Sequence, residues 1–293
     1  VDFGQGQYGN QKILISLRSG NMSECTHDCS TCSSNCGERK EPQSFLKPMN
    51  KNSNIKKVIG VVSGKGGVGK SLVSCLLAAK CQKAGLKVGV LDADITGPSV
   101  PKSFGITSRA MQDDTGLLPT VTKTGVKMMS INLLLEDVNS PVVWRGPVIS
   151  GVIEQFWTDV NWGELDYLFV DMPPGTGDVA LTVFQSLPVD GIVIVSTPQD
   201  LVKMIVNKAF NMAKIMNVPV LGLVENMSYY QCPDCGKKHN IFGESQIDET
   251  AKELGVPVLA KLPIDPEVAK LVDEGRVEDV ECPQLDEFVS ALD

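Results

Sequence analysis

The sequence lacks three features that would each point to a particular class of protein. No apolar run approaches the ~20 residues that a helix needs to cross a bilayer. The N-terminus has no compact apolar core followed by a small-residue cleavage site, the pattern of a secretory signal. Basic residues are outnumbered by acidic ones, 27 against 35, for a formal net charge of -8 at pH 7. We therefore expect a cytoplasmic protein with neither nucleic acid nor membrane as a partner.

Cysteine is abundant by contrast, at nine residues, and its distribution is uneven. Four cysteines lie within residues 25–36 and two more lie at positions 232 and 235. Because no secretion signal accompanies them, a disulfide framework is not expected and metal binding is favoured.

The chain divides into four segments by composition. We expect residues 1–21, which match nothing downstream in character, to be a vector remnant or a disordered extension. Residues 22–46 are polar and Cys-rich, and they cannot build a core without a metal. Residues 47–55 are predicted to be a linker. Residues 56–293, at 42% apolar composition for the whole chain, can bury a large core and form the main domain.

Short aliphatic runs alternate with amphipathic segments throughout the main domain. The predicted strands are Val58–Ser63, Val88–Asp92, Val126–Leu134, Tyr167–Asp171, Gly191–Ser196, Val220–Glu225 and Val256–Leu262. The predicted helices include Ser71–Ala84, Val179–Leu187, Leu201–Met216 and Glu244–Leu254. Nearly continuous Val, Ile and Leu in the strands indicates burial on both faces. The prediction is a doubly wound α/β fold, a mainly parallel sheet flanked by helices.

A phosphate-binding loop follows the first predicted strand. The segment GKGGVGKS fits G-x-x-x-x-G-K-[ST] between a strand and a helix, a context that argues against a chance Gly-rich turn. Its residues are Gly64, Lys65, Gly66, Gly67, Val68, Gly69, Lys70 and Ser71. Backbone N–H groups and the helix N-terminus would hold phosphate oxygens. Lys70 would reach the β- and γ-phosphates, and the Ser71 hydroxyl would ligate Mg²⁺. We therefore predict a P-loop ATPase domain.

Acidic residues end two other strands. An Asp that closes an apolar strand beside a P-loop commonly holds Mg²⁺ and its waters, and we assign this role to Asp171. Gly175, four residues on, is predicted to sense the γ-phosphate through its N–H. Asp92 closes another strand, where strand-end capping is an alternative role.

Lys65 makes this loop resemble the deviant Walker A loop of the ParA/MinD/nitrogenase-iron-protein class. In that class the matching lysine crosses a dimer interface to the partner's nucleotide. The resemblance implies that Lys65 acts catalytically in trans, as an arginine finger does. A solvated surface lysine is the alternative. The resemblance also implies that Asp94 orients the attacking water and that Asp92 supports Mg²⁺ from behind its direct ligands.

The same resemblance implies that the nucleotide is ATP. In that class the residue matching Asn226 hydrogen-bonds adenine, and the loop that contains Pro263 flanks the base. The residues alone indicate only a nucleoside triphosphate, although the absence of N-K-x-D at this strand end disfavours GTP.

Six short motifs narrow the resemblance further. In order they are KGGVGKS at 65–71, DADITGPS at 92–99, WRGP at 144–147, DMPPGTGD at 171–178, NMS at 226–228 and CPDC at 232–235. Together they are similar to the Mrp/ApbC group of iron–sulfur cluster carrier ATPases, whereas MinD and ParA relatives lack the late C-x-x-C. The resemblance implies a homodimer that binds a [4Fe–4S] cluster between its subunits and transfers it to apo iron–sulfur client proteins.

Cys232 and Cys235 supply two thiolates, which cannot complete a tetrahedral four-cysteine site. Another pair in the chain, or the same pair from a second subunit, would supply the rest, and two-fold symmetry suits a bridging cluster. The alternative is a structural zinc knuckle with His239 as third ligand, since sulfur-rich tetrahedral sites suit both metals. The ATPase context favours the cluster.

A second group of thiolates lies near the N-terminus. Its members are Cys25, Cys29, Cys32 and Cys36. Four cysteines suit a [4Fe–4S] cluster or zinc. Some members of the resembled family carry an N-terminal ferredoxin-like cluster here with a different spacing, so the role is carried over by position and cysteine count.

Three functions compete. The first is an ATP-dependent iron–sulfur scaffold or carrier with slow, Mg²⁺-dependent, dimer-coupled hydrolysis. The second is a MinD/ParA-like positioning ATPase with a structural zinc knuckle. Against it, the C-terminal residues 284–293 are acidic, whereas a membrane-surface helix is rich in Lys and Arg. The third is a nitrogenase-type electron donor, whose cysteines are not normally paired as C-x-x-C. We favour the first.

Overall fold

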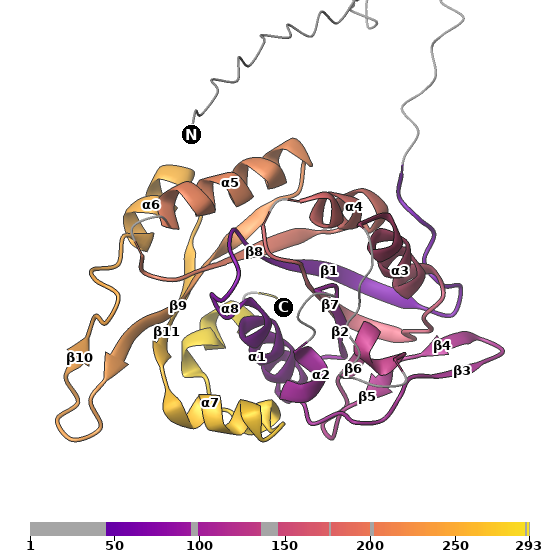
Figure 1. The fold of residues 1–293 in the computed structure, drawn as a ribbon, viewed down its shortest axis with the longest axis horizontal. Coiled ribbons are helices and arrows are strands. Elements are labelled where there is room, and N and C mark those ends of the chain that lie inside the picture. The colour runs from indigo at the N-terminus through magenta and orange to yellow at the C-terminus, as the bar shows by residue number, and fades with distance from the viewer. Residues whose placement is uncertain are drawn as a thin grey trace, which may run out of the picture. The chain divides into compact units, whose positions relative to one another are not determined.

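The computed structural model describes residues 45–94, 99–135, 146–175, 177–199, 202–290 and 292. Its centre is a mainly parallel sheet (Figure 1). The strands run in the order β10 (Lys238–His239), β9 (Val220–Gln231), β8 (Gly191–Ser196), β1 (Asn54–Ser63), β7 (Glu164–Asp171), β2 (Val88–Asp92), β6 (Lys127–Ser130) and β5 (Thr120–Val121), with β11 (Val258–Ile264) also paired to β9. Only β5 and β10 pair antiparallel to their neighbours in this sheet of the described residues.

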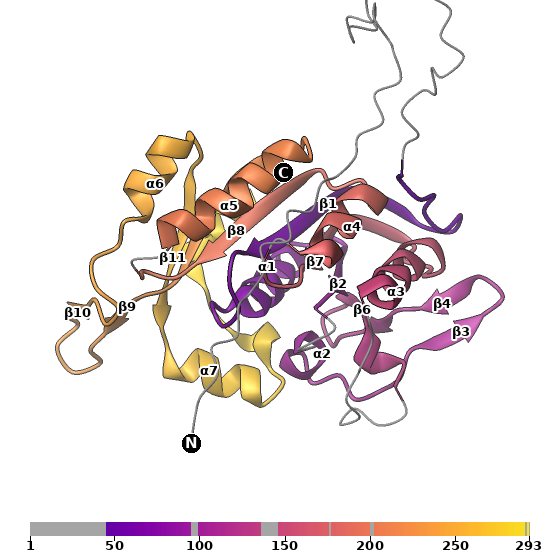
Figure 2. The ribbon, with the colours of Figure 1, turned by 45° about the horizontal axis from the view of Figure 1, so that its top comes forward.

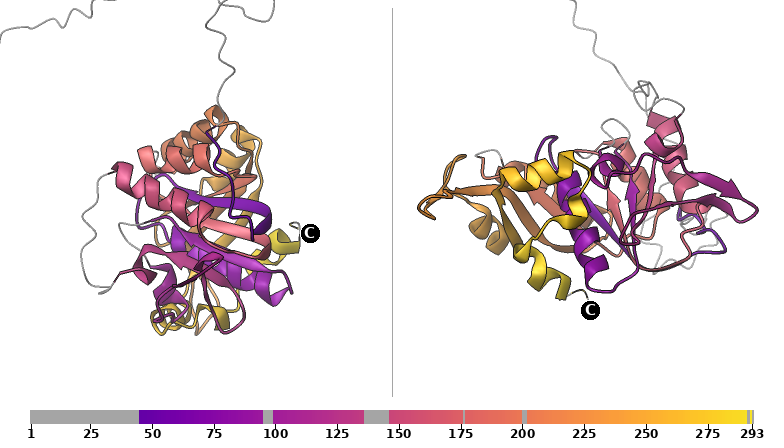
Figure 3. Two further views of the ribbon diagram at one scale, coloured as in Figure 1. Left: turned by 90° about the vertical axis from the view of Figure 1, so that its right-hand side faces the viewer. Right: turned by 90° about the horizontal axis from the view of Figure 1, so that it is seen from below.

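Helices cover both faces of the sheet (Figures 1 and 3). One face carries α3 (Gly146–Thr158), α4 (Asp178–Ser186), α5 (Val202–Ile215) and α6 (Ile247–Leu254). The other carries α1 (Lys70–Lys83), α2 (Val100–Ser103), α7 (Pro266–Asp273) and α8 (Asp286–Ser290). Short 3-10 turns η1 (Ile131–Leu133), η2 (Val277–Asp279) and η3 (Pro283–Leu285), and a hairpin of β3 (Met111–Asp113) and β4 (Gly116–Leu118), complete the domain. The predicted doubly wound α/β fold is confirmed.

Two apolar cores separate the helices from the sheet. Every residue of β2 and of β8 is buried, because helices lie on both of their faces. Phe156 and Trp157 of α3 pack in one core, and Val73 and Leu77 of α1 pack in the other. Among the described residues, no helix is long and apolar enough to cross a membrane.

The structure corrects the predicted linker at residues 47–55. The Lys47 carbonyl accepts a hydrogen bond from Trp157 Nε1 at 3.0 Å, and Asn50 is 9% exposed. Asn50 Nδ2 donates to the carbonyls of Thr115 and Asp159, each at 3.1 Å. The segment is therefore part of the domain, held by polar contacts that its composition did not reveal, and β1 begins at Asn54 rather than at Val58.

Several predicted strands have other bounds in the structure: β7 begins at Glu164 rather than at Tyr167, and β11 spans Val258–Ile264 rather than Val256–Leu262. The strand predicted at Val126–Leu134 stops at Ser130, whose Oγ accepts from the Asn132 N–H and turns the chain into η1. The strand predicted at Val220–Glu225 continues to Gln231, so Asn226 lies inside β9 rather than at its end. The predicted extension 1–21 and nearly all of the Cys-rich segment 22–46, up to residue 44, lie outside the described residues.

Candidate functional site

The phosphate loop connects β1 to α1 at the carboxyl edge of the sheet, where β2 and β7 also end. Gly67 and Gly69 have φ angles of 77° and 81°, in the left-handed region that favours glycine. A Cβ added to Gly69 would lie 2.1 Å from Asn226 Nδ2. That amide nitrogen donates to the Val68 carbonyl at 3.0 Å. The curled backbone is therefore supported from behind by a side chain of β9.

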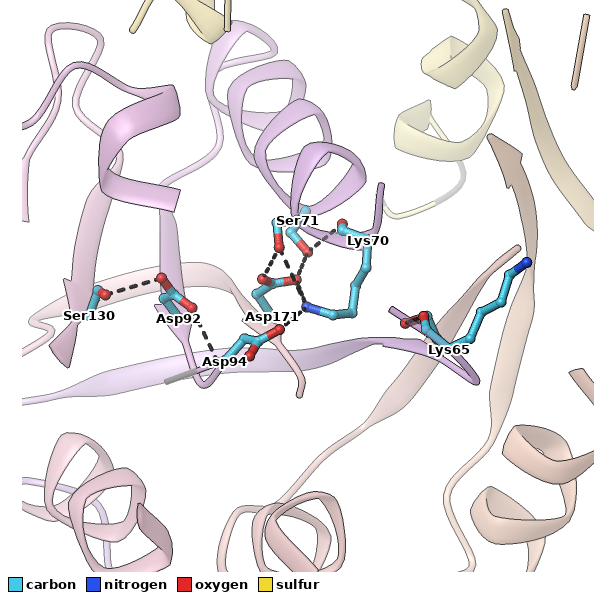
Figure 4. A network of polar contacts seen from close by, with 9 residues as sticks. Lys65, Lys70, Ser71, Asp92, Asp94, Ser130 and Asp171 are labelled. Carbon is cyan, nitrogen blue, oxygen red and sulfur yellow. Dashed lines mark hydrogen bonds and ion pairs between the residues drawn. The ribbon is translucent and has the colours of Figure 1, made fainter. Parts of the chain in front are cut away.

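Lys70 and Ser71 begin α1 and turn toward a buried carboxylate (Figure 4). Lys70 is 6% exposed, and its Nζ lies 2.8 Å from Asp171 Oδ1 and 3.6 Å from Asp94 Oδ2. Ser71 Oγ donates to Asp171 Oδ2 at 2.6 Å. Four residues that the sequence placed at one site therefore share a single cluster.

Ser74 also belongs to this cluster, and sequence reasoning missed it. Its hydroxyl lies one helical turn after Lys70 and donates to Asp171 Oδ1 at 2.8 Å. A polar residue at this spacing within an otherwise apolar helix was the available signal. Asp171 is completely buried and is held by a lysine and two hydroxyl groups.

Asp92 lies beside Asp171 in the register of β2 and β7. Ser130 Oγ donates to its Oδ2 at 3.0 Å, and the Asp94 N–H donates to its Oδ1 at 3.2 Å. Burial, and secondarily the neighbouring Asp171 carboxylate, raises the pKa of Asp92 well above its ordinary value. A cation at this edge would relieve the repulsion between the two carboxylates.

The donor set fits Mg²⁺. The hydroxyl of Ser71 and the carboxylate of Asp171 are hard oxygen donors at the beginning of a helix that follows a P-loop. Asp92 stands behind them on the neighbouring strand.

Lys65 extends away from the carboxylates, whereas Lys70 turns toward them (Figure 4). The Nζ of Lys65 contacts Oε1 of Gln199, in the loop after β8. Within one chain the two lysines of the loop therefore serve different partners, and Lys65 is only half buried.

Gly175 and Pro263, predicted to contact the γ-phosphate and the base, make backbone contacts within the domain. The Gly175 N–H donates to the Ser63 carbonyl at 2.8 Å, so this bond must break before the N–H can bind phosphate. Pro263 pairs with Tyr229 in the sheet.

A cavity of about 340 Å³ adjoins the loop. Ser99 and Ser103, near and in α2, and Val272 of α7 line it together with the loop residues, Asp94 and Pro174. Neither short helix figured in the predictions. Asp265 caps α7 and Pro266 occupies its first turn, a helix-start signal that could have found it.

Cys232 and Cys235 lie in the turn between β9 and β10, at the end of the sheet (Figures 1 and 2). The Cys232 N–H donates to the Lys237 carbonyl, and the Gly236 N–H donates to the Cys232 carbonyl, both at 2.9 Å. Hydrogen bonds from the backbone N–H groups of Cys235 and then Asp234 lower the pKa of the Cys232 thiol. The turn is preorganised to present thiolates.

No third ligand joins this pair within the part of the chain that the structure describes. No group of three or more His, Cys, Asp or Glu that could hold a metal ion is found there. His239 is exposed and pairs with Tyr230 in the hairpin. A tetrahedral site on Cys232 and Cys235 therefore needs ligands from elsewhere.

The remaining cysteines either lie in the core or fall outside the described residues. Cys75, Cys81 and Cys282 are buried, and burial raises the pKa of Cys75 and of Cys282. The N-terminal group Cys25, Cys29, Cys32 and Cys36 lies outside the described residues, as do Trp144 and Arg145.

Comparison with known proteins decides the family. The sequence profile of the NUBPL iron-transfer P-loop NTPases, in the ParA group, matches residues 54–291. The chain belongs to this family.

Relatives in the family are named for iron–sulfur cluster carriage. The chain is 50% identical over 234 residues to the iron-sulfur cluster carrier protein of Clostridium perfringens, covering 77% of this chain and 82% of that protein. It is 47% identical over 274 residues to the carrier protein of Methanocaldococcus jannaschii, covering 91% and 94%.

Solved structures agree with this assignment. A nucleotide-binding protein of Archaeoglobus fulgidus, in complex with ADP and with cobalt found in it, is 47% identical. It superposes with a TM-score of 0.73, covering 80% of this chain and 92% of that one. The cell division ATPase MinD of Pyrococcus furiosus, at 19% identity and a TM-score of 0.58, covers 81% of this chain and 97% of its own. That similarity shows the shared fold alone. This chain is thus an iron-transfer P-loop NTPase by family, with a ParA/MinD fold.

Proposed function

We propose that this family member is an ATP-dependent scaffold and carrier for a [4Fe–4S] cluster. Two copies of the chain assemble the cluster between them and transfer it to apo-proteins. The observation that carries the proposal is the Cys232/Cys235 turn. It presents two thiols at the end of the sheet, that of Cys232 with backbone N–H support, without a third ligand among the described residues.

Two-fold symmetry supplies the missing ligands. A homodimer that brings two such turns together offers four thiolates around one point, the ligand set of a [4Fe–4S] cluster. Because each turn protrudes from its domain, the thiols can meet without rearrangement of either core (Figure 1). Carriage also requires a site at the surface, from which the cluster can leave.

ATP hydrolysis follows from the polar side chains grouped around Asp171. Lys70 exchanges Asp171 and Asp94 for the β- and γ-phosphates, and Asp94 orients the attacking water. Mg²⁺, held by Ser71 and Asp171 with Asp92 behind them, would neutralise charge on the phosphate oxygens. Asn226 and the segment around Pro263 serve the adenine base, and Gly175 binds the γ-phosphate once its bond to Ser63 opens.

Dimerisation completes the hydrolytic site. Lys65 leaves Gln199 and reaches the nucleotide of the partner subunit, where its charge stabilises the transition state. Hydrolysis is therefore slow and depends on the dimer, because the lifetime of each nucleotide state matters more than turnover. The N-terminal cysteines form a second metal site of the same chain, and the protein acts in the cytoplasm.

Iron and acid-labile sulfide analysis tests the proposal. After anaerobic reconstitution, the wild type is expected to hold iron and sulfide that Cys232→Ala/Cys235→Ala loses. Cys282→Ala, which removes a buried cysteine far along the chain, is the matched control and should keep them. Zinc without labile sulfide at Cys232 and Cys235 would make the turn a structural knuckle and end the carrier proposal.

A further inference from the structure

One strand connects the nucleotide loop to the cysteine turn. Asn226 of β9 holds the Val68 carbonyl of the phosphate loop, and the same strand ends at Gln231, immediately before Cys232. Any shift of the loop that moves Asn226 therefore acts on the chain that leads to the thiols.

The strand is irregular between these two points. Met227 has a φ of 57°, in the left-handed region that non-glycine residues rarely adopt. From Glu225 to Tyr229, β9 advances four residues while β11 advances two, from Lys261 to Pro263. Such a bulge bends a strand and re-aims the residues beyond it. The bend lies between the nucleotide contact and the cysteine turn, where a hinge would have to be.

A single buried carboxylate holds both ends of the segment that carries the cysteines. Glu225 is 1% exposed, and its Oε2 accepts from Ser228 Oγ at 2.6 Å. Its Oε1 accepts from Ser245 Oγ at 2.9 Å. Ser228 lies within the bulge, next to Met227 on the outgoing strand, and Ser245 stands just before α6, where the returning chain rejoins the domain. We call Glu225, Ser228 and Ser245 the hairpin clamp.

The clamp also adjoins the partner of Lys65. Gln199, which the Lys65 side chain contacts, lines a small cavity together with Glu225. The hairpin clamp therefore stands beside two groups that contact the phosphate loop: Asn226, its neighbour in sequence, and Gln199 across the cavity.

We propose that Glu225 is a positioning residue that couples nucleotide at the phosphate loop to the orientation of the cysteine turn. Movement of Asn226 is transmitted through the bulge at Met227, and the clamp makes both strands of the hairpin follow it as one body. The proposal rests on the proposed function only in taking Cys232 and Cys235 as the functional thiols.

Site-resolved thiol alkylation tests the coupling without a cluster. The cluster-free full-length chain is treated with iodoacetamide, with and without Mg²⁺ and a non-hydrolysable ATP analogue. The alkylation rates of Cys232 and Cys235 are followed by peptide mass spectrometry. In the wild type we expect the nucleotide to change these rates by about fivefold or more, the lower range of allosteric coupling. Nucleotide affinity is measured in parallel.

The variants separate positioning from general loosening. For each cysteine, the nucleotide effect is the ratio of its alkylation rates with and without nucleotide, taken as the larger rate over the smaller. Glu225→Ala is expected to bring this ratio to about 1 while nucleotide affinity stays within about threefold of the wild type. Ser228→Ala and Ser245→Ala each remove one bond and keep the carboxylate, so they should lower the ratio even if Glu225→Ala fails to fold. Glu225→Gln, whose amide can accept from one serine and donate to the other, should largely restore it.

Ser186→Ala is the matched control, because it removes another serine–carboxylate bond, 2.9 Å from Glu154, away from the hairpin. It should leave the ratio unchanged. A wild-type ratio near one, a wild-type-like ratio in the clamp variants, or an equal loss in Ser186→Ala would overturn the proposal. Because no cluster is present, these outcomes are independent of the iron and sulfide analysis that tests the proposed function.

Discussion

The two lysines of the phosphate loop differ in burial and in partners, although they lie five residues apart. Lys70 is almost fully buried and neutralises carboxylates of its own chain, whereas Lys65 is half buried and its Nζ contacts the uncharged side chain of Gln199. The same charge therefore contributes to folding at one position and is available for a partner at the other.

Lys70→Ala should impair both stability and catalysis. Removing one partner of a buried ion pair leaves an uncompensated charge and costs about 3–5 kcal/mol. We expect a clear fall in Tm by scanning calorimetry, together with loss of ATP hydrolysis. Metal bound at the proposed N-terminal site, on a separate segment, should be retained. A variant with wild-type Tm would show that the ion pair contributes nothing to the fold.

Lys65→Ala should reduce ATP hydrolysis while leaving stability and nucleotide binding intact. Its partner is not charged, so we expect Tm and nucleotide affinity close to those of the wild type. Hydrolysis should fall by about 10³-fold or more, in line with the loss of an arginine finger. Steady-state phosphate release checks this, and undiminished turnover by a monomer would contradict the role in trans.

Two glycines of the phosphate loop, Gly69 and Gly66, offer a matched pair of alanine variants. Gly69→Ala should lower Tm and weaken nucleotide binding, because its φ is 81° and the new Cβ would meet Asn226. Gly66→Ala meets no atom within 4 Å and should leave Tm unchanged. Equal Tm values for the two variants would show that Asn226 can move aside at no cost.

At the scale of elements, the sequence predicts what burial dictates and misses what polar contacts dictate. The ends of β2 and β8 were predicted to the residue, because each is a continuous aliphatic run. The first residues of β1 were missed because their side chains are mainly polar and their pairing with β7 is made by the backbone.

The candidate site shows the same division. Lys70, Ser71 and Asp171 were brought together from the P-loop motif and from a strand that ends in an aspartate, and Asp94 from the resemblance to the deviant Walker A class. The bulge at Met227 and the contacts of Glu225 could not be predicted, because they depend on the register of β9 against β11 and on a serine that follows the hairpin.

Asp166 gives a pH prediction at this scale, at the end of the sheet opposite the site. Its carboxylate accepts from Lys56 Nζ and from the Lys87 N–H, each at 2.7 Å, and these bonds lower its pKa, the Lys56 side chain first. A lowered folded-state pKa gives stability that is present above the ordinary pKa of Asp and is lost as the pH falls through the lowered value.

Asp166→Asn should therefore be less stable than the wild type near pH 7, and the difference in unfolding free energy should narrow in acid. Urea unfolding between pH 7 and the acid limit of the fold checks this. ATP hydrolysis at pH 7 should be unchanged, since Asp166 lies near the start of β7 and the phosphate-binding site lies at the other end of that strand. A difference that grows on acidification would show that the carboxylate is not stabilised by these donors.

At the scale of the whole molecule, the nucleotide site and the cysteine turn both depend on a second copy in our account. The Lys65 side chain points to Gln199 rather than to the carboxylates of its own site, and the described residues give the thiol pair no third ligand. One dimer interface would complete both sites, so that nucleotide state and cluster retention become linked.

Hydrolysis should therefore depend on dimerisation. We expect the specific activity of cluster-free protein to rise with protein concentration, and reconstitution of the cluster to shift the rise to lower concentration. Phosphate release measured across a dilution series checks this. A specific activity that is constant throughout the series would indicate a site complete within one chain.

The most direct test of the bridging cluster is native mass spectrometry of the reconstituted Cys25→Ser/Cys29→Ser/Cys32→Ser/Cys36→Ser variant. This variant leaves Cys232 and Cys235 as the only clustered cysteines of the chain. Our account predicts two chains with a single four-iron, four-sulfide cluster, and no iron- and sulfide-bearing species when Cys232 and Cys235 are also replaced. A cluster on a single chain, or zinc without sulfide, would contradict it.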